Sequence, residues 1–269
     1  MCAPKDENGP SVMDDMFAGW LAALEARHLA DLRVPEVTRA LRALSSAYVQ
    51  RRHTIARGGA LDSAGKRAAF ALVYAPLHFL AMRHVVRHLQ AQTPAPDTIV
   101  DLGCGTGAAG AAWAVEANGA PRVIGIDRHP WALAEARWTY RQLGLRGDAR
   151  QGDAARFRPS PAFCARGRLC IIAAYALNEL TEGSRQTLAR TLIDAGTRGT
   201  RVLILEPISR AVTPWWDSVA DDVVTAGGRN DEWHIPLDLP PMLRMFDKAA
   251  GLEHRAIKAR SLYLWQQSA

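Results

Sequence analysis

The sequence has few cysteines and no long uninterrupted hydrophobic run. Its four cysteines in 269 residues form no C-x-x-C pair and no regular framework. This usage fits a reducing compartment and predicts no structural zinc or other bound metal. No apolar run reaches the roughly 18–20 residues that a membrane span needs, and the first 20 residues lack the apolar core of a secretory signal. We therefore expect a cytoplasmic protein without a membrane partner.

Positive charge is concentrated in one part of the chain. The formal net charge is +6 and the isoelectric point is about 9.4. Between Arg39 and Leu89 there are nine basic residues and one acidic residue, Asp62, which gives this stretch a larger positive charge than the whole chain. Such a patch suits a polyanion such as RNA. The alternative is an ordinary solvated basic helix surface.

The first third of the chain has the pattern of a helical extension. Residues 1–12 are small and polar and are expected to be disordered. Hydrophobic residues then recur at helical spacing over 13–49 and again over 66–90, where Pro76 should kink the helix or split it in two. A proline-containing linker ends this part, so we predict an N-terminal helical extension over 1–96 and a second domain over 97–269.

The second part alternates between strand and helix patterns, which predicts an α/β fold. The order of strands and helices favours a doubly wound, mostly parallel, seven-stranded sheet with helices on both faces. The expected strands cover 98–102, 122–126, 149–151, 168–173, 201–205, 253–258 and 261–265, the last two as a closing hairpin. The expected helices cover 108–118, 130–143, 183–195 and 239–249.

A glycine-rich turn follows the first of these strands. Gly103-x-Gly105-x-Gly107 comes directly after the apolar residues 98–102. Glycines allow a tight turn and a close approach of the backbone to a ligand, and the next helix points its free N–H groups at the same place. Asp127 ends the second strand, 20 residues after Gly107. An acid at that spacing can accept both hydroxyls of a ribose.

Two kinds of nucleotide cofactor compete for this turn. Gly105-x-Gly107-x-x-Gly110 satisfies the dinucleotide fingerprint, but Asp101 precedes the first glycine of the turn by two residues. A carboxylate there would repel a pyrophosphate, whereas it suits a cofactor with positive sulfonium and ammonium groups. The segment Asp101–Gly107 resembles motif I of the class I methyltransferases. The resemblance implies a Rossmann-like fold and S-adenosyl-L-methionine as cofactor.

The resemblance to methyltransferases continues after the third strand. In Gln151-Gly152-Asp153-Ala154, it implies that Asp153 accepts a hydrogen bond from the adenine amine and that the next backbone N–H donates to the ring. The residues expected at the cofactor are Asp101, Gly103, Cys104, Gly105, Gly107, Asp127, Arg128, Asp153, Ala154 and Ala174.

The methyl acceptor is expected after the fourth strand, within the segment Ala174–Leu180. Asn178 and Glu179 could orient an acceptor or take its proton, and Tyr175 could stack on a ring. Asn178 or Glu179 could instead cap the following helix. Glu206, at the end of the fifth strand, is a further candidate for the acceptor mouth. The tryptophans of 214–217 and 231–234 could form a lid over the acceptor, or pack on the sheet.

Over roughly residues 40–210 the chain also resembles the small-ribosomal-subunit methyltransferase-like family, known from mitochondrial ribosome assembly. The similarity rests on four segments: the helix Ala68–Leu89 with Tyr74-Ala75-Pro76, motif I, Ala174–Leu180 and Leu203–Pro207. It implies an RNA-associated protein that binds S-adenosylmethionine. Three hypotheses follow: a methyltransferase acting on ribosomal RNA or in ribosome assembly, a small-molecule N- or O-methyltransferase, and a non-catalytic S-adenosylmethionine-binding module.

Overall fold

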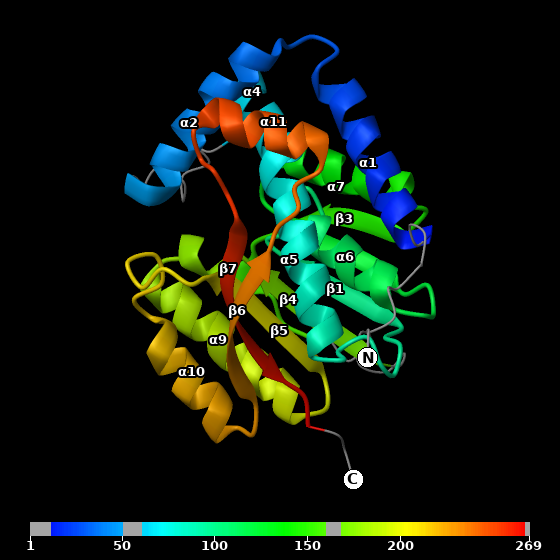
Figure 1. Ribbon diagram of the computed structural model, residues 1–269. Coiled ribbons are helices and arrows are strands. Elements are labelled where there is room, and N and C mark those ends of the chain that lie inside the picture. Colours follow the sequence, from blue (N-terminus) through cyan, green and yellow to red (C-terminus); the bar gives the residue numbers. More distant parts are fainter. Residues whose placement is uncertain (1–11, 51–60, 160–167, 267–269) are drawn as a thin grey trace, which may run out of the picture.

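The computed structural model describes residues 12–50, 61–159 and 168–266, and it confirms the α/β fold class. A seven-stranded sheet lies between helices on both faces, and α1, α2 and α11 gather at the end of the molecule away from α9 and α10 (Figure 1). The strands are β1 (Thr98–Leu102), β2 (Arg122–Asp127), β3 (Gly147–Gln151), β4 (Leu169–Ala174), β5 (Arg201–Pro207), β6 (Arg229–Pro236) and β7 (Ala256–Leu264). The α-helices are α1 (Val12–His28), α2 (Val34–Gln50), α4 (Ala64–Ala69), α5 (Ala75–His88), α6 (Ala108–Glu116), α7 (Pro130–Gln142), α9 (Glu182–Thr197), α10 (Trp216–Thr225) and α11 (Pro241–Ala250).

The order of the strands places a crevice above β1. The sheet runs β3-β2-β1-β4-β5-β7-β6, with β1 to β5 parallel and β7 antiparallel to both of its neighbours. In register, Val100 of β1 lies beside Ile124 of β2 and Ile171 of β4. Successive connections leave β1 in opposite directions along the sheet. Ligands bind at the carboxyl ends of the strands at such a switch point.

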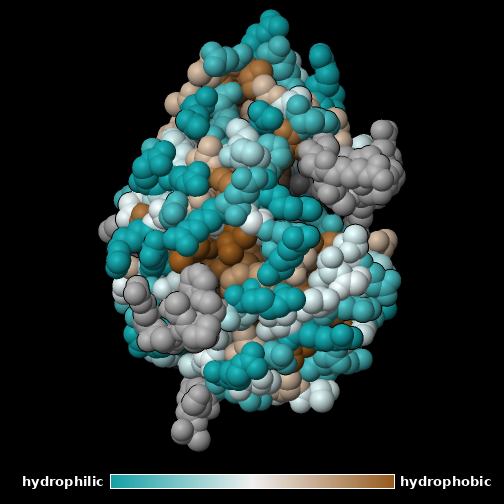
Figure 2. All heavy atoms as spheres, turned by 180° about the vertical axis from the view of Figure 1, so that it is seen from behind, coloured by the Kyte–Doolittle hydropathy of each residue, from teal (hydrophilic) through white to brown (hydrophobic). Residues whose placement is uncertain are grey.

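The strands of the sheet contribute side chains to two hydrophobic cores, one on each face. Ile99 and Leu203 pack on the face covered by α1, α5 and α6, whereas Val100 and Ile204 pack on the face covered by α9 and α10. This alternation follows from the two-residue period of a strand. From behind, hydrophobic residues gather near the middle of the surface and hydrophilic residues surround them (Figure 2).

One long helical segment crosses the sheet, and Pro76 does not split it. The π-turn η1 (Phe70–Tyr74) joins α4 to α5, and the N–H of Ala75 bonds the carbonyl of Phe70 five residues back. A proline inside a regular helix lacks a donor and collides with the carbonyl four residues back, and the wider turn accommodates it. By length and composition, Ala64–His88 could cross a membrane, but its apolar window is 72% buried inside the structure, where the helix packs against α6.

The first predicted helical region forms two helices, α1 and α2, and a buried carboxylate holds the first of them to the domain. Arg27 and His28, in the last turn of α1, contact Glu135 of α7 at 2.7 and 3.1 Å. Burial alone would raise the pKa of Glu135, but the hydrogen bonds from His28 and Arg27 outweigh it, and the pKa is lowered. The N-terminal extension is thus tied to the helix that follows β2.

The C-terminal part of the sheet differs from the prediction. The expected hairpin of 253–258 and 261–265 is wrong, because β7 is one continuous strand that lies antiparallel between β5 and β6. The polar residues of β6 hid it from sequence analysis, since an edge strand buries little of its surface. The helix α10 was also not predicted. Arg260 falls between the two expected strands, and in the structure it lies within β7 with its side chain buried over the ring of Trp216.

The ion pairs of Glu135 give a prediction about stability. Glu135→Ala should lower the free energy of unfolding by about 1–3 kcal/mol, because Arg27 and His28 lose the acceptor that compensates their partial burial. Urea denaturation measures the loss. The exposed Glu25 on α1 provides the control variant Glu25→Ala, and equal losses in the two variants would contradict the assignment.

Candidate active site

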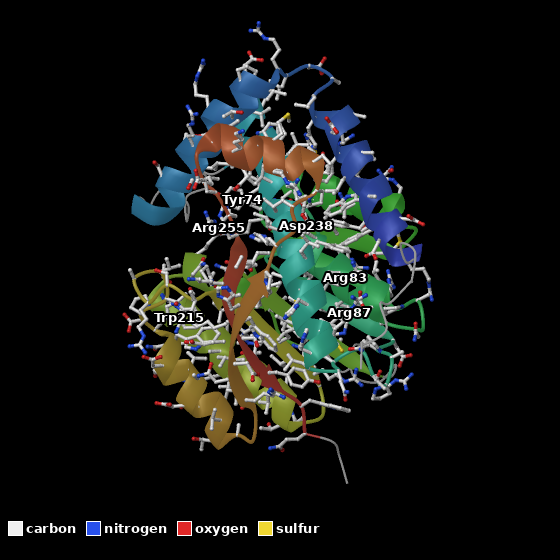
Figure 3. All side chains as sticks on the ribbon, in the orientation of Figure 1. Tyr74, Arg83, Arg87, Trp215, Asp238 and Arg255 are labelled. Atoms are coloured by element: carbon white, nitrogen blue, oxygen red, sulfur yellow. The ribbon has the colours of Figure 1, made fainter. Side chains whose placement is uncertain are left out.

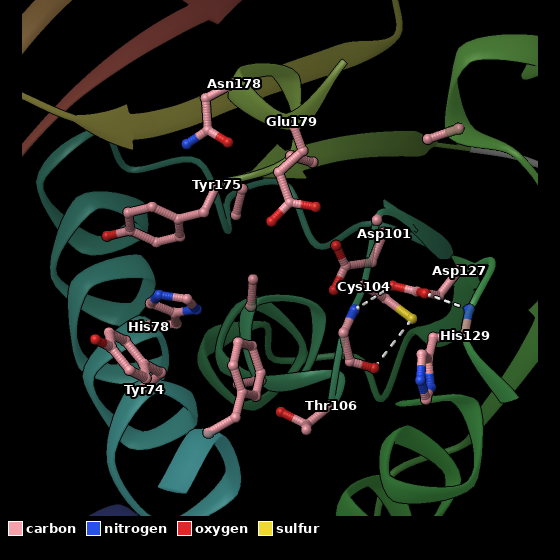
Figure 4. A pocket seen from close by; sticks show the side chains of 18 of the residues that line it. Tyr74, His78, Asp101, Cys104, Thr106, Asp127, His129, Tyr175, Asn178 and Glu179 are labelled. Carbon is pink, nitrogen blue, oxygen red and sulfur yellow. Dashed lines mark hydrogen bonds between the residues drawn. The ribbon is translucent and has the colours of Figure 1, made fainter. Parts of the chain in front are cut away.

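A pocket of about 810 Å³ opens at the carboxyl ends of β1, β2 and β4. Its walls come from the turn after β1, the ends of β2 and β3, the segment after β4, the long helix Ala64–His88 and the beginning of β7 (Figure 4). Of the thirteen residues expected at the site from the sequence, twelve line this pocket, the exception being Gly107. The fold therefore brings together the predicted cofactor and acceptor residues, while their binding roles stay predictions.

The glycine turn needs its glycines for two different reasons. All three have positive φ angles, of 68°, 51° and 79° for Gly103, Gly105 and Gly107. A Cβ on Gly103 would lie 2.7 Å from the Cβ of Ala176, so the turn packs directly on the segment after β4. A Cβ on Gly107 would lie 2.8 Å from the ring of Tyr140. Gly107 therefore lets the turn pack on α7 and stands behind the pocket wall.

Asp101 is a buried carboxylate with one oxygen available. It is 1% exposed, and its Oδ2 accepts a hydrogen bond from the N–H of Gly110 at 2.8 Å. Burial raises the pKa of Asp101 to about 7, although the hydrogen bond from Gly110 lowers it. The negative charge of Asp127 adds to the rise. A cation in the pocket would stabilise the ionised form. This wall therefore fits the positively charged end of S-adenosylmethionine and does not fit a pyrophosphate.

Asp127 joins the second strand to the glycine turn. Its Oδ2 accepts from the N–H of Gly105 at 2.9 Å and its Oδ1 from the N–H of His129 at 2.8 Å (Figure 4). Each oxygen keeps a further lone pair for a ribose hydroxyl. Beside it, the Oδ1 of Asp153 accepts from the N–H of Ala155 at 3.0 Å, at the start of the short helix η2 (Ala154–Arg156). Both carboxylates are thus fixed by backbone donors before any ligand binds.

Tyr175 forms an aromatic wall across the pocket from these acids. Its φ of 56° is a left-handed conformation, and its N–H bonds the carbonyl of Leu205 at 2.7 Å. Such strain in a residue other than glycine is found mainly at functional sites. The ring stacks on that of His78, with centroids 4.0 Å apart and planes at 16°. Burial lowers the pKa of His78 to about 3, so this imidazole is neutral at pH 7.

Glu179 places a carboxylate between the aromatic wall and the cofactor acids (Figure 4). It ends the short helix η3 (Leu177–Glu179). Burial raises its pKa to about 7, the charge of Asp127 adds to the rise, and Arg128 opposes it. A carboxylate with a pKa near neutrality is well matched to proton transfer.

The prediction that Glu206 lines the acceptor mouth is wrong. The residue is fully buried behind the pocket, where its Oε1 accepts from the N–H groups of Leu177 and Asn178 at 2.9 and 3.2 Å. Burial raises the pKa of Glu206 to about 8. Its role is to hold the backbone that carries Asn178 and Glu179.

Sequence analysis missed the part of the pocket that the long helix supplies. Phe70, Tyr74 and His78 recur every four residues, face the pocket and contact one another through their rings. The spacing was visible, but apolar residues at helical intervals more often indicate a core. A Cβ on Gly105 would lie 3.6 Å from Phe70, so the helix reaches the glycine turn itself.

The tryptophans do not form a lid, since Trp215, Trp216 and Trp233 are all absent from the pocket lining. Trp216 is 1% exposed in the core below α10. Trp233 packs edge-on against the imidazoles of His84 and His88 on α5. Packing on the sheet, the alternative considered from the sequence, accounts for them.

Half of the described cations in the basic stretch 39–89 form ion pairs. Arg83 and Arg87 project from α5 (Figure 3) and contact Glu116 at 2.7 and 2.6 Å. Lys66 contacts Asp62 at 3.0 Å. Arg51, Arg52 and Arg57 lie outside the described residues. The charge available to a polyanion on the described part is therefore smaller than the sequence indicates.

The buried carboxyls give a prediction about pH. The unfolded chain ionises Asp101, Glu179 and Glu206 near pH 4, whereas the folded protein keeps their protons until about pH 7 to 8. The folded state therefore binds more protons in this window, and stability falls as the pH rises. Between pH 7.5 and 8.5, well above the ordinary histidine pKa of about 6.5, His78 is neutral in both states, and the melting temperature of the ligand-free protein should drop. Glu206→Gln should reduce the drop, and a melting temperature that rises with pH would contradict the assignment.

Comparisons with known proteins support a methyltransferase domain in this chain. Residues 99–195 match the family model described as a methyltransferase domain. No curated protein sequence matches the chain. Among solved structures, the chain is similar to a "putative O-methyltransferase" from Nostoc punctiforme PCC 73102, with 14% identity, 83% and 72% of the two chains covered and a TM-score of 0.53. Magnesium protoporphyrin IX methyltransferase from Synechocystis PCC 6803 has 14% identity, with 85% of this chain and 97% of that chain covered and a TM-score of 0.49. A "putative RNA methyltransferase" from Pyrococcus horikoshii has 10% identity, with 87% of this chain and 100% of that chain covered and a TM-score of 0.46. At 14% identity, the likeness to the Nostoc structure is one of fold. With the matching domain and the carboxylates around its glycine turn, the chain is an S-adenosylmethionine-dependent methyltransferase of the class I, Rossmann-like fold.

Proposed function

We propose that this enzyme methylates a planar small-molecule acceptor in the cytoplasm. The observation that carries the proposal is the stacked pair of Tyr175 and His78, which faces the cofactor acids across a pocket of about 810 Å³. Pockets of about 300–1,000 Å³ with mainly apolar walls and a few convergent polar groups are typical of small ligands. A flat ring would stack on the exposed face of this aromatic wall.

The cofactor's place in the pocket follows from charge. S-adenosylmethionine supplies a methyl group on a positive sulfur, and the electron pair of the broken carbon–sulfur bond stays on that sulfur as the acceptor atom takes the methyl group. We place its cationic end at Asp101, its ribose at Asp127 and its adenine at Asp153. Asp101 and Asp127 are already fixed by hydrogen bonds from Gly110 and Gly105, so little side-chain freedom is lost when the cofactor binds.

Glu179 is the group that we assign to the acceptor's proton. Methyl transfer to an O–H or N–H group releases a proton, which the carboxylate of Glu179 accepts. The pKa of about 7 lets this side chain be ionised before the reaction and protonated after it. Asn178, on the same short helix, orients the acceptor through its amide. The neutral imidazole of His78 adds no positive charge that would repel the cofactor.

Replacement of Glu179 tests the assignment. Glu179→Gln should lower kcat by about 10²–10⁴-fold, the usual contribution of a positioned acid or base. Isothermal titration with S-adenosylmethionine should give a dissociation constant close to that of the wild type. In the wild type, kcat/KM should rise with pH through about 7 as Glu179 loses its proton.

The exposed Glu182 at the start of α9 gives the matched control, Glu182→Gln. Full activity of Glu179→Gln, or an equal loss in the two variants, would remove Glu179 from the chemistry.

Methylation of ribosomal RNA during assembly of the small subunit is the second candidate. All four segments that resemble the small-ribosomal-subunit family meet in this pocket, where they contribute Tyr74, Asp101, Tyr175 and Pro207. A nucleobase turned out of its stack would fit the same aromatic wall. Incubation with radiolabelled cofactor separates the candidates: label in acid-precipitated, ribonuclease-sensitive material favours RNA, and label in the acid-soluble fraction favours a small molecule.

A further inference from the structure

The two ends of the pocket differ in charge. Four carboxylates, those of Asp101, Asp127, Asp153 and Glu179, line the part built from β1, β2, β3 and the segment after β4. The part built from α2, the loop before β7 and β7 itself has no acidic residue among its described lining. It carries the polar residues Ser45, His254 and Lys258 instead. A ligand that spans the pocket therefore meets four carboxylates and the cation Arg128 at one end, and the cation Lys258 without a described lining carboxylate at the other.

Lys258 is a cation without a partner in the described part of the chain. It lies on β7 opposite His234 of β6, its side chain is exposed at the pocket, and it forms no ion pair or hydrogen bond with a described residue. The other described cation that lines the pocket, Arg128, lies at the acidic end, where its charge opposes the rise in the pKa of Glu179. An ammonium group at the rim of a pocket, free of internal partners, is available to a ligand.

His254 stands on the same wall, and a buried acid orients it. Its Nδ1 contacts the carboxylate of Asp247, and its backbone N–H donates to the other oxygen of that carboxylate at 2.8 Å. Asp247 is 6% exposed, on α11. Because Nδ1 is engaged, Nε2 is the ring nitrogen left for a ligand. Lys258 and His254 thus present two nitrogen atoms to this end of the pocket.

We propose that the methyl acceptor carries an anionic group, a carboxylate or a phosphate, which binds at Lys258 and His254. The inference rests on the proposed function, since it names the acceptor class of the same site. In the reverse orientation, the anion would lie beside Glu179 and Asp127, where repulsion would be strong in a partly buried site. Charge therefore fixes which end of the acceptor faces the methyl group.

The sheet also keeps the two groups apart. Lys258 is on β7 and Glu179 follows β4, and one strand, β5, separates them. The anionic group therefore binds away from the atom that takes the methyl group.

The experiment uses the full-length enzyme, radiolabelled S-adenosylmethionine and an acid-soluble metabolite extract that contains no RNA. The labelled product should be retained on an anion-exchange resin at pH 8. Loss of retention after phosphatase treatment identifies a phosphate, and unchanged retention identifies a carboxylate. A labelled product that passes through the resin would overturn the inference but leave the proposed function standing. No labelled product, despite cofactor binding in calorimetry, would overturn the proposed function and this inference with it.

Two lysine variants test the residue itself. Lys258→Gln should lower labelling by about tenfold at limiting extract, because a charge-assisted contact is lost. The deficit should shrink as the extract concentration rises, since the loss is in acceptor affinity. Lys248→Gln removes an exposed lysine of α11 that does not line the pocket, and it should label as the wild type does. Wild-type labelling by Lys258→Gln, with both variants folded by thermal melting, would exclude Lys258 from acceptor recognition.

Discussion

The close approach of the glycine turn to the segment after β4 is the contact on which the site depends. Because Gly103 has no Cβ, Ala176 can pack directly beside it. A side chain at position 103 would collide with the Cβ of Ala176. The turn brings Asp101 and the segment brings Tyr175 and Glu179, so one backbone contact sets the distance between the cofactor and acceptor walls. Glu206 supports the contact from behind by holding two N–H groups of the segment. The two walls of the pocket are thus in direct contact where they meet.

The carboxylates of the site favour a positively charged ligand. Asp101, Asp127 and Glu179 lie close enough to influence one another, and burial raises the pKa of two of them to about 7. The ligand-free protein bears this electrostatic cost because the acids are held by backbone donors and by the surrounding core. A cation between them would relieve the cost, and the same acids would repel the phosphates of a dinucleotide. The same carboxylates therefore favour a cationic cofactor and destabilise the ligand-free protein.

Sequence patterns predicted the parallel half of the sheet and the cofactor wall well. Strand β1 has the predicted bounds, β2, β4 and β5 lie within a residue or two of them, and the glycine turn and Asp127 stand at the end of the strands that the pattern identified. Such features are local, because a buried strand and a glycine turn each show in consecutive residues. The edge strand β6 and the π-turn before Pro76 were not foreseeable in the same way. Their conformations depend on what lies across from them, namely β7 and the glycine turn.

The π-turn also restricts the number of residues in the long helix. A regular helix turns by 100° per residue, so the one extra residue within Phe70–Tyr74 rotates α4 relative to α5 by about that angle. With this offset, Phe70 faces the glycine turn while Phe79 and Val86 still face the core. Loss of a single residue from the turn would straighten the helix and move one of these faces out of place. The length of this segment is therefore as restricted as its composition, and natural variation there should consist of substitutions and not of deletions.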